Sequence, residues 1–291
     1  MAVKSSPTTL RRQLGAELRR LRDASGRTVA DVARSLGWSE SKLSRIETAH
    51  TGIRNRDLDL LLDTYSVPDD DRRRIQAVAV QSRQRAWWEG YRDVLPDAYE
   101  MLIGFESEAE SLQCYEGLVV PGLLQTDEYA RAVFESDGHR HDGRALGVSE
   151  IDQKVAVRMA RQSLLTRQPP LDFVAILDEG VLHRQVGGPG VLRRQLIRLA
   201  ETSERANVTI QVLPFSAGAH PALAGAFAIL RFSGGQSPLV HCEVRTGGIF
   251  QTRAEEVEGY AASFDELRAI ALSPEKSIDF LHTASREAGN R

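Results

Sequence analysis

Two short amphipathic segments, separated by a short turn that contains one glycine, constrain the fold of this chain more than any other feature. Apolar side chains recur at helical spacing in both segments, at Val29, Val32, Ala33 and Leu36 and again at Leu43 and Ile46. Gly37 lies between them, and glycine readily takes the backbone conformations that end a helix. The pattern therefore predicts two short helices joined by a tight turn.

Two polar residues mark where these helices begin. Thr28 and Asp31 have the spacing of a capping box, in which a hydroxyl and a carboxylate satisfy backbone amides of the first turn. Ser39 stands directly before the second segment and predicts an N-cap there. Further amphipathic helices are expected at 10–24 and 56–65, so the region 1–67 reads as a small all-α domain.

The polar residues of the second segment suit contact with duplex DNA. Two helices joined by a glycine turn form a helix-turn-helix, whose second helix enters the major groove with its N-terminal residues. Arg45 can bond a guanine edge with two donors, and Ser41 can reach a base or a phosphate. Glu40 either accepts from cytosine or simply favours the helix dipole, and we prefer the second interpretation.

Basic residues nearby are expected to contact the DNA backbone. Lys42 reads as a phosphate contact, and the loop at 50–56 is polar and basic. Residues 1–66 contain 12 Lys and Arg against 8 Asp and Glu, whereas the remainder contains 25 against 32, so only the first region is suited to a polyanion. For any single arginine, the alternative to a DNA contact is a position on a solvated basic face. The candidate DNA-binding residues are Thr28, Val29, Ser39, Glu40, Ser41, Lys42, Arg45, Arg54 and Arg56.

Residues 10–67 resemble the Xre family of helix-turn-helix domains, the five-helix type found in phage repressors. The matching stretches are 18–22, 29–33, 36–37 and 41–47. The resemblance implies that Glu47 pairs with Arg22, which makes both residues structural. It also implies that the base-reading positions are Val29, Glu40, Ser41 and Arg45. Val29 differs from the polar residue that is common at its position. Its side chain can contact a thymine methyl group, or it makes no contact with a base.

The region 68–105 is predicted to be a helical connector. Three aspartates at 69–71 favour the N-terminus of a helix. Trp87, Trp88 and Tyr91 follow in a chain that is only 6% aromatic, so their clustering calls for a role. The spacing of Trp88 and Tyr91 favours packing onto a second domain, with an aromatic ligand wall or a dimer seam as the alternative.

The region 106–285 alternates predicted strands and helices, which indicates an α/β (α+β) domain with a central mixed sheet. Strands are expected at 171–177, 208–213, 227–232 and 239–244. Helices are expected at 127–134, 149–165, 179–185, 191–206 and 254–270, the last closing the domain, while 106–116 is ambiguous. Ser149 is expected to cap its helix, and Lys154, Arg158 and Arg161 to lie on the outer side of it.

Four stretches of this region, 120–131, 158–162, 211–215 and 225–230, resemble an actinobacterial regulator family. Its members join an Xre domain to a C-terminal domain of unknown role. They are often called antitoxin-like or Scr1-family regulators and are typically paired with a small partner protein. The resemblance implies the architecture and supplies no chemical mechanism.

His241 and Glu243 are the main candidates for a catalytic or metal site, because alternate residues share one face of a strand. His220 could approach as a third ligand, but the spacing matches no known site, so a structural role is preferred. No enzyme activity, metal or cofactor is expected. Cys114 and Cys242 do not suggest a disulfide framework, and no stretch approaches a span of about 20 apolar residues or a signal peptide. The sequence therefore predicts a cytoplasmic location away from membranes.

Together the patterns predict a multi-domain protein, an all-α five-helix Xre-type helix-turn-helix domain followed by the α/β domain. The favoured function is a sequence-specific transcription regulator that binds double-stranded DNA as a homodimer. Its C-terminal domain would dimerise, sense a ligand or bind a partner. The alternative is an antitoxin-like interaction protein that binds a small protein encoded nearby and regulates its own synthesis through its DNA-binding domain.

Overall fold

The computed structural model of this protein describes residues 7–49, 51–82, 87–91, 94–137, 145–244 and 247–289. The chain divides into two compact units, Met1–Gly90 with Glu100–Glu108 and Tyr91–Tyr99 with Ala109–Arg291. Each unit has an apolar core of its own.

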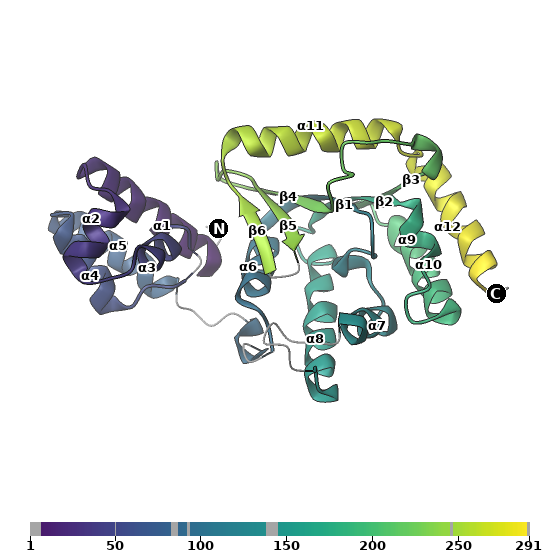
Figure 1. Ribbon diagram of the computed structural model, residues 1–291, viewed down its shortest axis with the longest axis horizontal. Coiled ribbons are helices and arrows are strands. Elements are labelled where there is room, and N and C mark those ends of the chain that lie inside the picture. Colours follow the sequence, from purple (N-terminus) through teal and green to yellow (C-terminus); the bar gives the residue numbers. More distant parts are fainter. Residues whose placement is uncertain are drawn as a thin grey trace. The chain divides into compact units, whose positions relative to one another are not determined.

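Five helices form the main body of the first unit (Figure 1). They are α1 (Pro7–Ala24), α2 (Val29–Leu36), α3 (Glu40–Glu47), α4 (Asn55–Thr64) and α5 (Asp69–Gln81). The expected all-α five-helix domain is therefore confirmed. Ile75 and Ala79 of α5 are buried with Leu18 of α1 and Leu61 of α4, which makes α5 part of this core.

Gly15 allows α1 to pass close to the end of α3. A Cβ atom at this position would lie 2.6 Å from the carbonyl oxygen of Glu47 and 2.8 Å from that of Ile46. Real Cβ atoms do not approach backbone atoms so closely, so only glycine fits here. Glycine has a lower helix propensity than alanine, so this close crossing costs α1 some intrinsic helix stability.

A mixed sheet of six strands forms the centre of the second unit, as expected. The strands are β1 (Ala109–Glu116), β2 (Asp172–Asp178), β3 (Val208–Leu213), β4 (Phe227–Phe232), β5 (Leu239–Val244) and β6 (Gly247–Gln251), in the spatial order β3-β2-β1-β4-β5-β6. The first three are parallel, and β4, β5 and β6 are each antiparallel to the preceding neighbour in the sheet.

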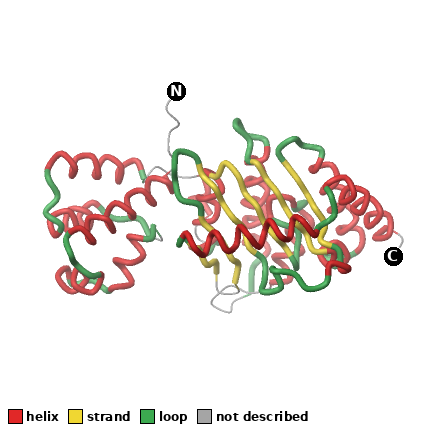
Figure 2. The backbone as a smooth tube through the Cα atoms, turned by 90° about the horizontal axis from the view of Figure 1, so that it is seen from above, coloured by secondary structure: helices red, strands yellow, loops and turns green. Residues whose placement is uncertain are grey.

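Helices cover both faces of this sheet (Figure 1). The α-helices that follow α5 along the chain are α6 (Asp97–Glu108), α7 (Asp127–Asp137), α8 (Val148–Arg161), α9 (Glu179–His183), α10 (Pro189–Ser203), α11 (Ala254–Ile270) and α12 (Pro274–Gly289). Figure 2 shows α11 running across the strands, and α7, α8 and α10 lie on the opposite face in Figure 1. Tyr115 packs in the core beneath α11 with Phe264. Because side chains alternate along a strand, Glu116 points to the face that carries α8.

The last helix covers the outer edge of β3. Ser277 of α12 accepts a hydrogen bond from the backbone N–H of Val212 at 3.0 Å, and the N–H of Leu272 donates to the Val212 carbonyl at 2.8 Å. Gln211 adds a bond to the carbonyl of Leu272. The backbone N–H and carbonyl of Val212 therefore find partners within the chain, which makes this part of the edge less open to unwanted strand pairing.

Several expected elements are confirmed to the residue, namely the strands at 208–213, 227–232 and 239–244 and the helix at 254–270. The expectation that this helix closes the domain is wrong, because α12 follows it. The ambiguous stretch 106–116 contains the end of α6 and the whole of β1, with the change at Ala109. No strand was expected at β6, because Gly247 and Gly248 weaken any strand pattern there.

Two local expectations for α8 are also wrong. The helix begins after Gly147, whose N–H donates to Glu150 Oε2 at 2.9 Å, so Ser149 lies inside the first turn rather than at the cap. Arg161, expected on the outer side, is only 5% exposed.

Trp87 and Trp88 lie in a single short 3-10 helix, Trp87–Tyr91. Their rings meet edge to face with centroids 5.5 Å apart, and Trp88 is buried whereas Trp87 is exposed. Residues 83–86 of the expected helical connector lie outside the described residues.

Candidate nucleic-acid interface

The start of α2 is closed by the expected capping box. Thr28 Oγ1 accepts from the N–H of Asp31 at 3.2 Å, and Asp31 Oδ2 accepts from the N–H of Thr28 at 3.1 Å. The helix ends at Gly37, which has a φ of 67°. A residue with a side chain would be strained in this left-handed conformation, so the glycine sets the turn.

The third helix begins directly after this turn. Ser39 is its N-cap, and its hydroxyl accepts from the N–H of Lys42 at 3.2 Å. Leu43 and Ile46 point into the core, and Ala33 of α2 is buried where the two helices meet. The two short helices are therefore held at a defined angle by a cap, a turn and a shared core.

Arg22 and Glu47 hold α3 against α1 on its inner side. Arg22 Nε lies 2.7 Å from Glu47 Oε1, and Arg22 Nη2 lies 3.0 Å from Glu47 Oε2. Their side chains are only 9% and 4% exposed. The pairing implied by the Xre resemblance is therefore confirmed, and hydrogen bonding to Glu47 raises the pKa of Arg22 above its ordinary value.

The outer face of α3 is polar and exposed. Glu40, Ser41 and Arg45 are all exposed, as are the two capping residues Thr28 and Ser39. Arg45 Nε donates to the carbonyl of Ser41 at 3.3 Å, so its guanidinium lies back along the helix towards its N-terminus. Val29 is half-buried and packs against the core of the unit.

Four exposed arginines of the described part of the first unit make no ion pair. They are Arg27, Arg45, Arg54 and Arg56. They come from the segment before α2, from α3 and from the start of α4, the elements that flank the turn. Sequence reasoning missed Arg27, and its position directly before the Thr28 cap was the available signal.

Other arginines of this unit are neutralised by acidic partners. Arg19, Arg20, Arg34, Arg72, Arg73 and Arg74 each have a carboxylate within ion-pair distance. The unpaired positive charge is thus concentrated around the helix-turn-helix, although basic residues are spread over the whole sequence of the unit. Such a concentration suits a polyanion.

Lys42 differs from these arginines because it already has partners. Its Nζ lies 3.0 Å from Asp57 Oδ2 of α4 and 3.7 Å from the centroid of the Trp38 ring. The lysine therefore joins the start of α3 to the start of α4 and to the turn. Part of its charge is neutralised before any ligand arrives.

The histidines considered as metal ligands lie on different faces of the sheet. His220 packs against Tyr115, with ring centroids 5.4 Å apart, in the layer covered by α11. His241 contacts Phe250 of β6 at 4.9 Å and interacts with Arg161 of α8. Among the described residues, no group of three or more His, Cys, Asp or Glu side chains could hold a metal ion.

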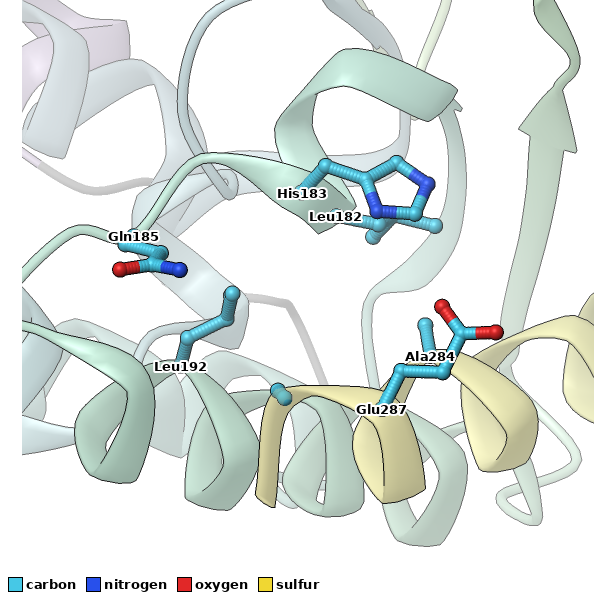
Figure 3. Close-up of a pocket in the computed structure, with 7 residues that line it drawn as sticks. Leu182, His183, Gln185, Leu192, Ala284 and Glu287 are labelled. Carbon is cyan, nitrogen blue, oxygen red and sulfur yellow. The ribbon is translucent and has the colours of Figure 1, made fainter. Parts of the chain in front are cut away.

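A cavity of about 10 Å³ lies between α9, α10 and α12 (Figure 3). His183 and Glu287 stand on opposite sides of it, and Leu182 and Leu192 line it. This volume has room for about one water molecule. The cavity is therefore too small to bind an organic ligand.

Comparison with known families agrees with this division. Residues 13–75 match the model of a helix-turn-helix domain, which supports a DNA-binding regulator. Residues 99–283 match the model of DUF5753, a domain of unknown function. No curated protein and no solved structure matches the chain. Among the described helices, none has the length and apolarity needed to cross a membrane.

The DUF5753 match covers well over half of the chain and coincides with the mixed sheet and the helices around it. The helix-turn-helix match begins within α1, ends within α5 and includes the whole of α2, α3 and α4. This chain therefore belongs to the DUF5753 family, with a helix-turn-helix domain preceding the family domain.

Proposed function

We propose that this protein is a sequence-specific transcription regulator that binds duplex DNA through α3. The observation that carries the proposal is the set of four unpaired arginines, Arg27, Arg45, Arg54 and Arg56, around a capped helix-turn-helix. Unpaired arginines bind phosphate and guanine without first breaking an internal ion pair.

Each residue has an assigned role in this proposal. Arg45 and Ser41 read base edges in the major groove, and Glu40 contributes mainly to the helix dipole. Arg54 and Arg56 bind phosphates beside the groove, and we add Arg27 to them. The remaining candidates, Thr28, Val29, Ser39 and Lys42, position the two helices. Lys42 adds only the part of its charge that Asp57 leaves free.

We further propose that the regulator acts as a homodimer. A twofold axis would place two copies of α3 in successive major grooves, about 34 Å apart, on a near-palindromic operator. The DUF5753 domain would carry dimerisation, ligand sensing or partner binding. A reducing, cytoplasmic location agrees with this role, because the operator lies there.

The test is to select the operator from a random DNA pool and to measure binding by fluorescence anisotropy. Replacing Arg45 with alanine is expected to cost about 1–3 kcal/mol on the operator and little on unrelated DNA. Arg73→Ala is the matched control, because Arg73 is exposed but paired with Asp70. Equal operator preference in wild type and Arg45→Ala would remove Arg45 from the base-reading set.

A second role is favoured by the acidic charge outside the helix-turn-helix domain. The rest of the chain contains 32 acidic residues and only 25 basic ones. Such a surface suits a small basic protein. In this antitoxin-like role the domain binds a partner encoded nearby, and DNA binding serves autoregulation. Mixing the two purified proteins and measuring their mass in solution tests it, and the absence of a complex with and without operator DNA would refute it.

A further inference from the structure

Lys42 and Asp57 form an ion pair between the two helices that carry most of the proposed DNA contacts. Lys42 lies in the first turn of α3, and Asp57 lies in the first turn of α4. Lys42 Nζ is 3.0 Å from Asp57 Oδ2. The pair therefore stands among the proposed phosphate contacts, and the proposed function gives Asp57 no task.

The ammonium group of Lys42 is held from two sides. Besides its contact with Asp57, Nζ lies 3.7 Å from the centroid of the Trp38 ring in the turn before α3, where the ring face attracts a cation. Both charged side chains still reach solvent, because 37% of Lys42 and 21% of Asp57 is exposed. The lysine charge is thus ordered and partly neutralised, yet it remains accessible to a phosphate.

Asp57 stands beside a residue that is proposed to bind phosphate. Arg56 comes directly before it and makes no ion pair with a described residue. A carboxylate at this place repels a DNA phosphate, and it offers Lys42 the same kind of oxygen acceptor that a phosphate would offer. Both effects oppose binding of the DNA backbone.

The alternative task for the pair is to join α3 to α4. Partly exposed ion pairs of this kind contribute little to stability. The start of α3 is already closed by the Ser39 cap, and its inner side is held by Leu43, Ile46 and the buried pair of Arg22 and Glu47. A purely structural task therefore accounts poorly for Asp57.

We propose that Asp57 competes with DNA phosphate for Lys42 and thereby sets the strength of backbone binding. This proposal rests on the proposed function, in which α3 binds duplex DNA. Lys42 can bind a phosphate only by giving up the carboxylate, so the gain from a released counter-ion is offset by the broken pair and by the negative charge left beside the DNA. Because phosphates carry no sequence information, Asp57 weakens binding to all duplexes alike and leaves sequence preference to Arg45 and Ser41.

The experiment compares wild type with Asp57→Asn in anisotropy titrations of the selected operator and a random duplex at several salt concentrations. Asparagine keeps the size of the side chain and removes its charge. In about 0.15 M salt, Asp57→Asn should bind both duplexes up to about fivefold more tightly, and its slope of log K against log salt should be steeper by about 0.9, the share of one phosphate contact. The ratio of operator affinity to random affinity should stay as in wild type.

Further variants make the test specific to Lys42. Asp63→Asn removes the same charge from the other end of α4, where Asp63 pairs with Arg72 of α5, and it should bind DNA like wild type. Adding Lys42→Gln to Asp57→Asn should abolish the gain in affinity, because no released ammonium group remains. Asp57→Ser repeats the test with a second neutral side chain, so that the result does not depend on the folding of one variant.

Four results would overturn the proposal. They are an unchanged affinity and salt slope in Asp57→Asn and Asp57→Ser, a gain that persists in the double variant, an equal gain in Asp63→Asn, and a lower ratio of operator to random affinity in Asp57→Asn. The last result would make Asp57 a residue that positions α3 for base reading. A wild-type chain that binds neither duplex would instead refute the proposed function, and this proposal with it.

Discussion

Arg22 of α1 and Glu47, the last residue of α3, form a buried ion pair through two hydrogen bonds of 2.7 and 3.0 Å. Glu47 lies two residues after Arg45, so the pair fixes the rotation of α3 and with it the direction of the exposed guanidinium. The residue that holds the helix and the residue proposed to read DNA therefore belong to the same short turn.

Replacing Glu47 with alanine should destabilise the first unit by about 3 kcal/mol, because Arg22 would keep a buried charge without its main partner. Urea unfolding followed by tryptophan fluorescence measures this, since Trp38, Trp87 and Trp88 are the three tryptophans of the chain and all lie in this unit. Arg20→Ala is the control. Its exposed pair with Glu17 should contribute little to stability, and an equal loss in both variants would contradict the assignment.

Gly15→Ala should destabilise the protein, although alanine is the better helix former. The new Cβ would meet the carbonyl oxygens of Ile46 and Glu47, so α1 and α3 would have to separate. Gly259→Ala is the matched control within α11, where a Cβ meets nothing within 4 Å. Thermal unfolding followed by circular dichroism should show a lower midpoint for Gly15→Ala and an unchanged or higher one for Gly259→Ala. A higher midpoint in both would show that the crossing is not tight.

Arg54→Ala should weaken binding to all duplex sequences alike, because a phosphate contact carries no sequence information. The slope of log K against log salt should fall by about one unit, the share of one released counter-ion. Anisotropy titrations at several salt concentrations give this slope for operator and random DNA. Arg73→Ala should leave it unchanged, and a loss confined to the operator would make Arg54 a base-reading residue instead.

The stability of the second unit should fall as the pH rises from 6.5 to about 8. Glu116 keeps its proton in the folded state up to about pH 8 but loses it near 4.5 when unfolded, so the folded state binds more protons over this interval. His241 acts in the opposite sense below pH 6.5, because its folded pKa of about 4 lies below the unfolded value. Above pH 6.5, the pH dependence of the unfolding free energy therefore reports Glu116 without a contribution from His241.

The check is urea unfolding followed by circular dichroism at both ends of that interval. Wild type should lose up to about 2 kcal/mol more than Glu116→Gln, the free energy of one proton over this range. His241→Asn should share the wild-type loss above pH 6.5 and should lose less stability than wild type below it. An identical pH dependence in wild type and Glu116→Gln would show that Glu116 is not protonated in the folded protein.

The helix-turn-helix could be predicted because its determinants are local. The Thr28 cap, the Gly37 turn and the stripe at Leu43 and Ile46 depend on residues within one or two turns of each other. The strand 227–232 and the helix 254–270 were equally accessible, since each carries its own apolar pattern. Gly15 carries no such local signal, because the backbone atoms that require a glycine there belong to α3.

Arg161 shows where local reasoning fails. Helical spacing assigned Arg161 to the solvent side of α8, yet Tyr99 covers it from another part of the chain. Likewise, β6 has too little pattern of its own and exists because β5 pairs with it. The sequence of α8 does not reveal that Tyr99 packs on Arg161, and the sequence of β6 does not reveal that it pairs with β5.

By itself the sequence determined the capped helix-turn-helix, the mixed α/β character of the larger region and the pairing of Glu47 with Arg22 through family resemblance. Only the tertiary structure decided which arginines remain unpaired and which are buried. The physical reason is range: caps, turns and periodicity act over a few residues, whereas burial and ion pairing depend on side chains that folding brings together from distant segments.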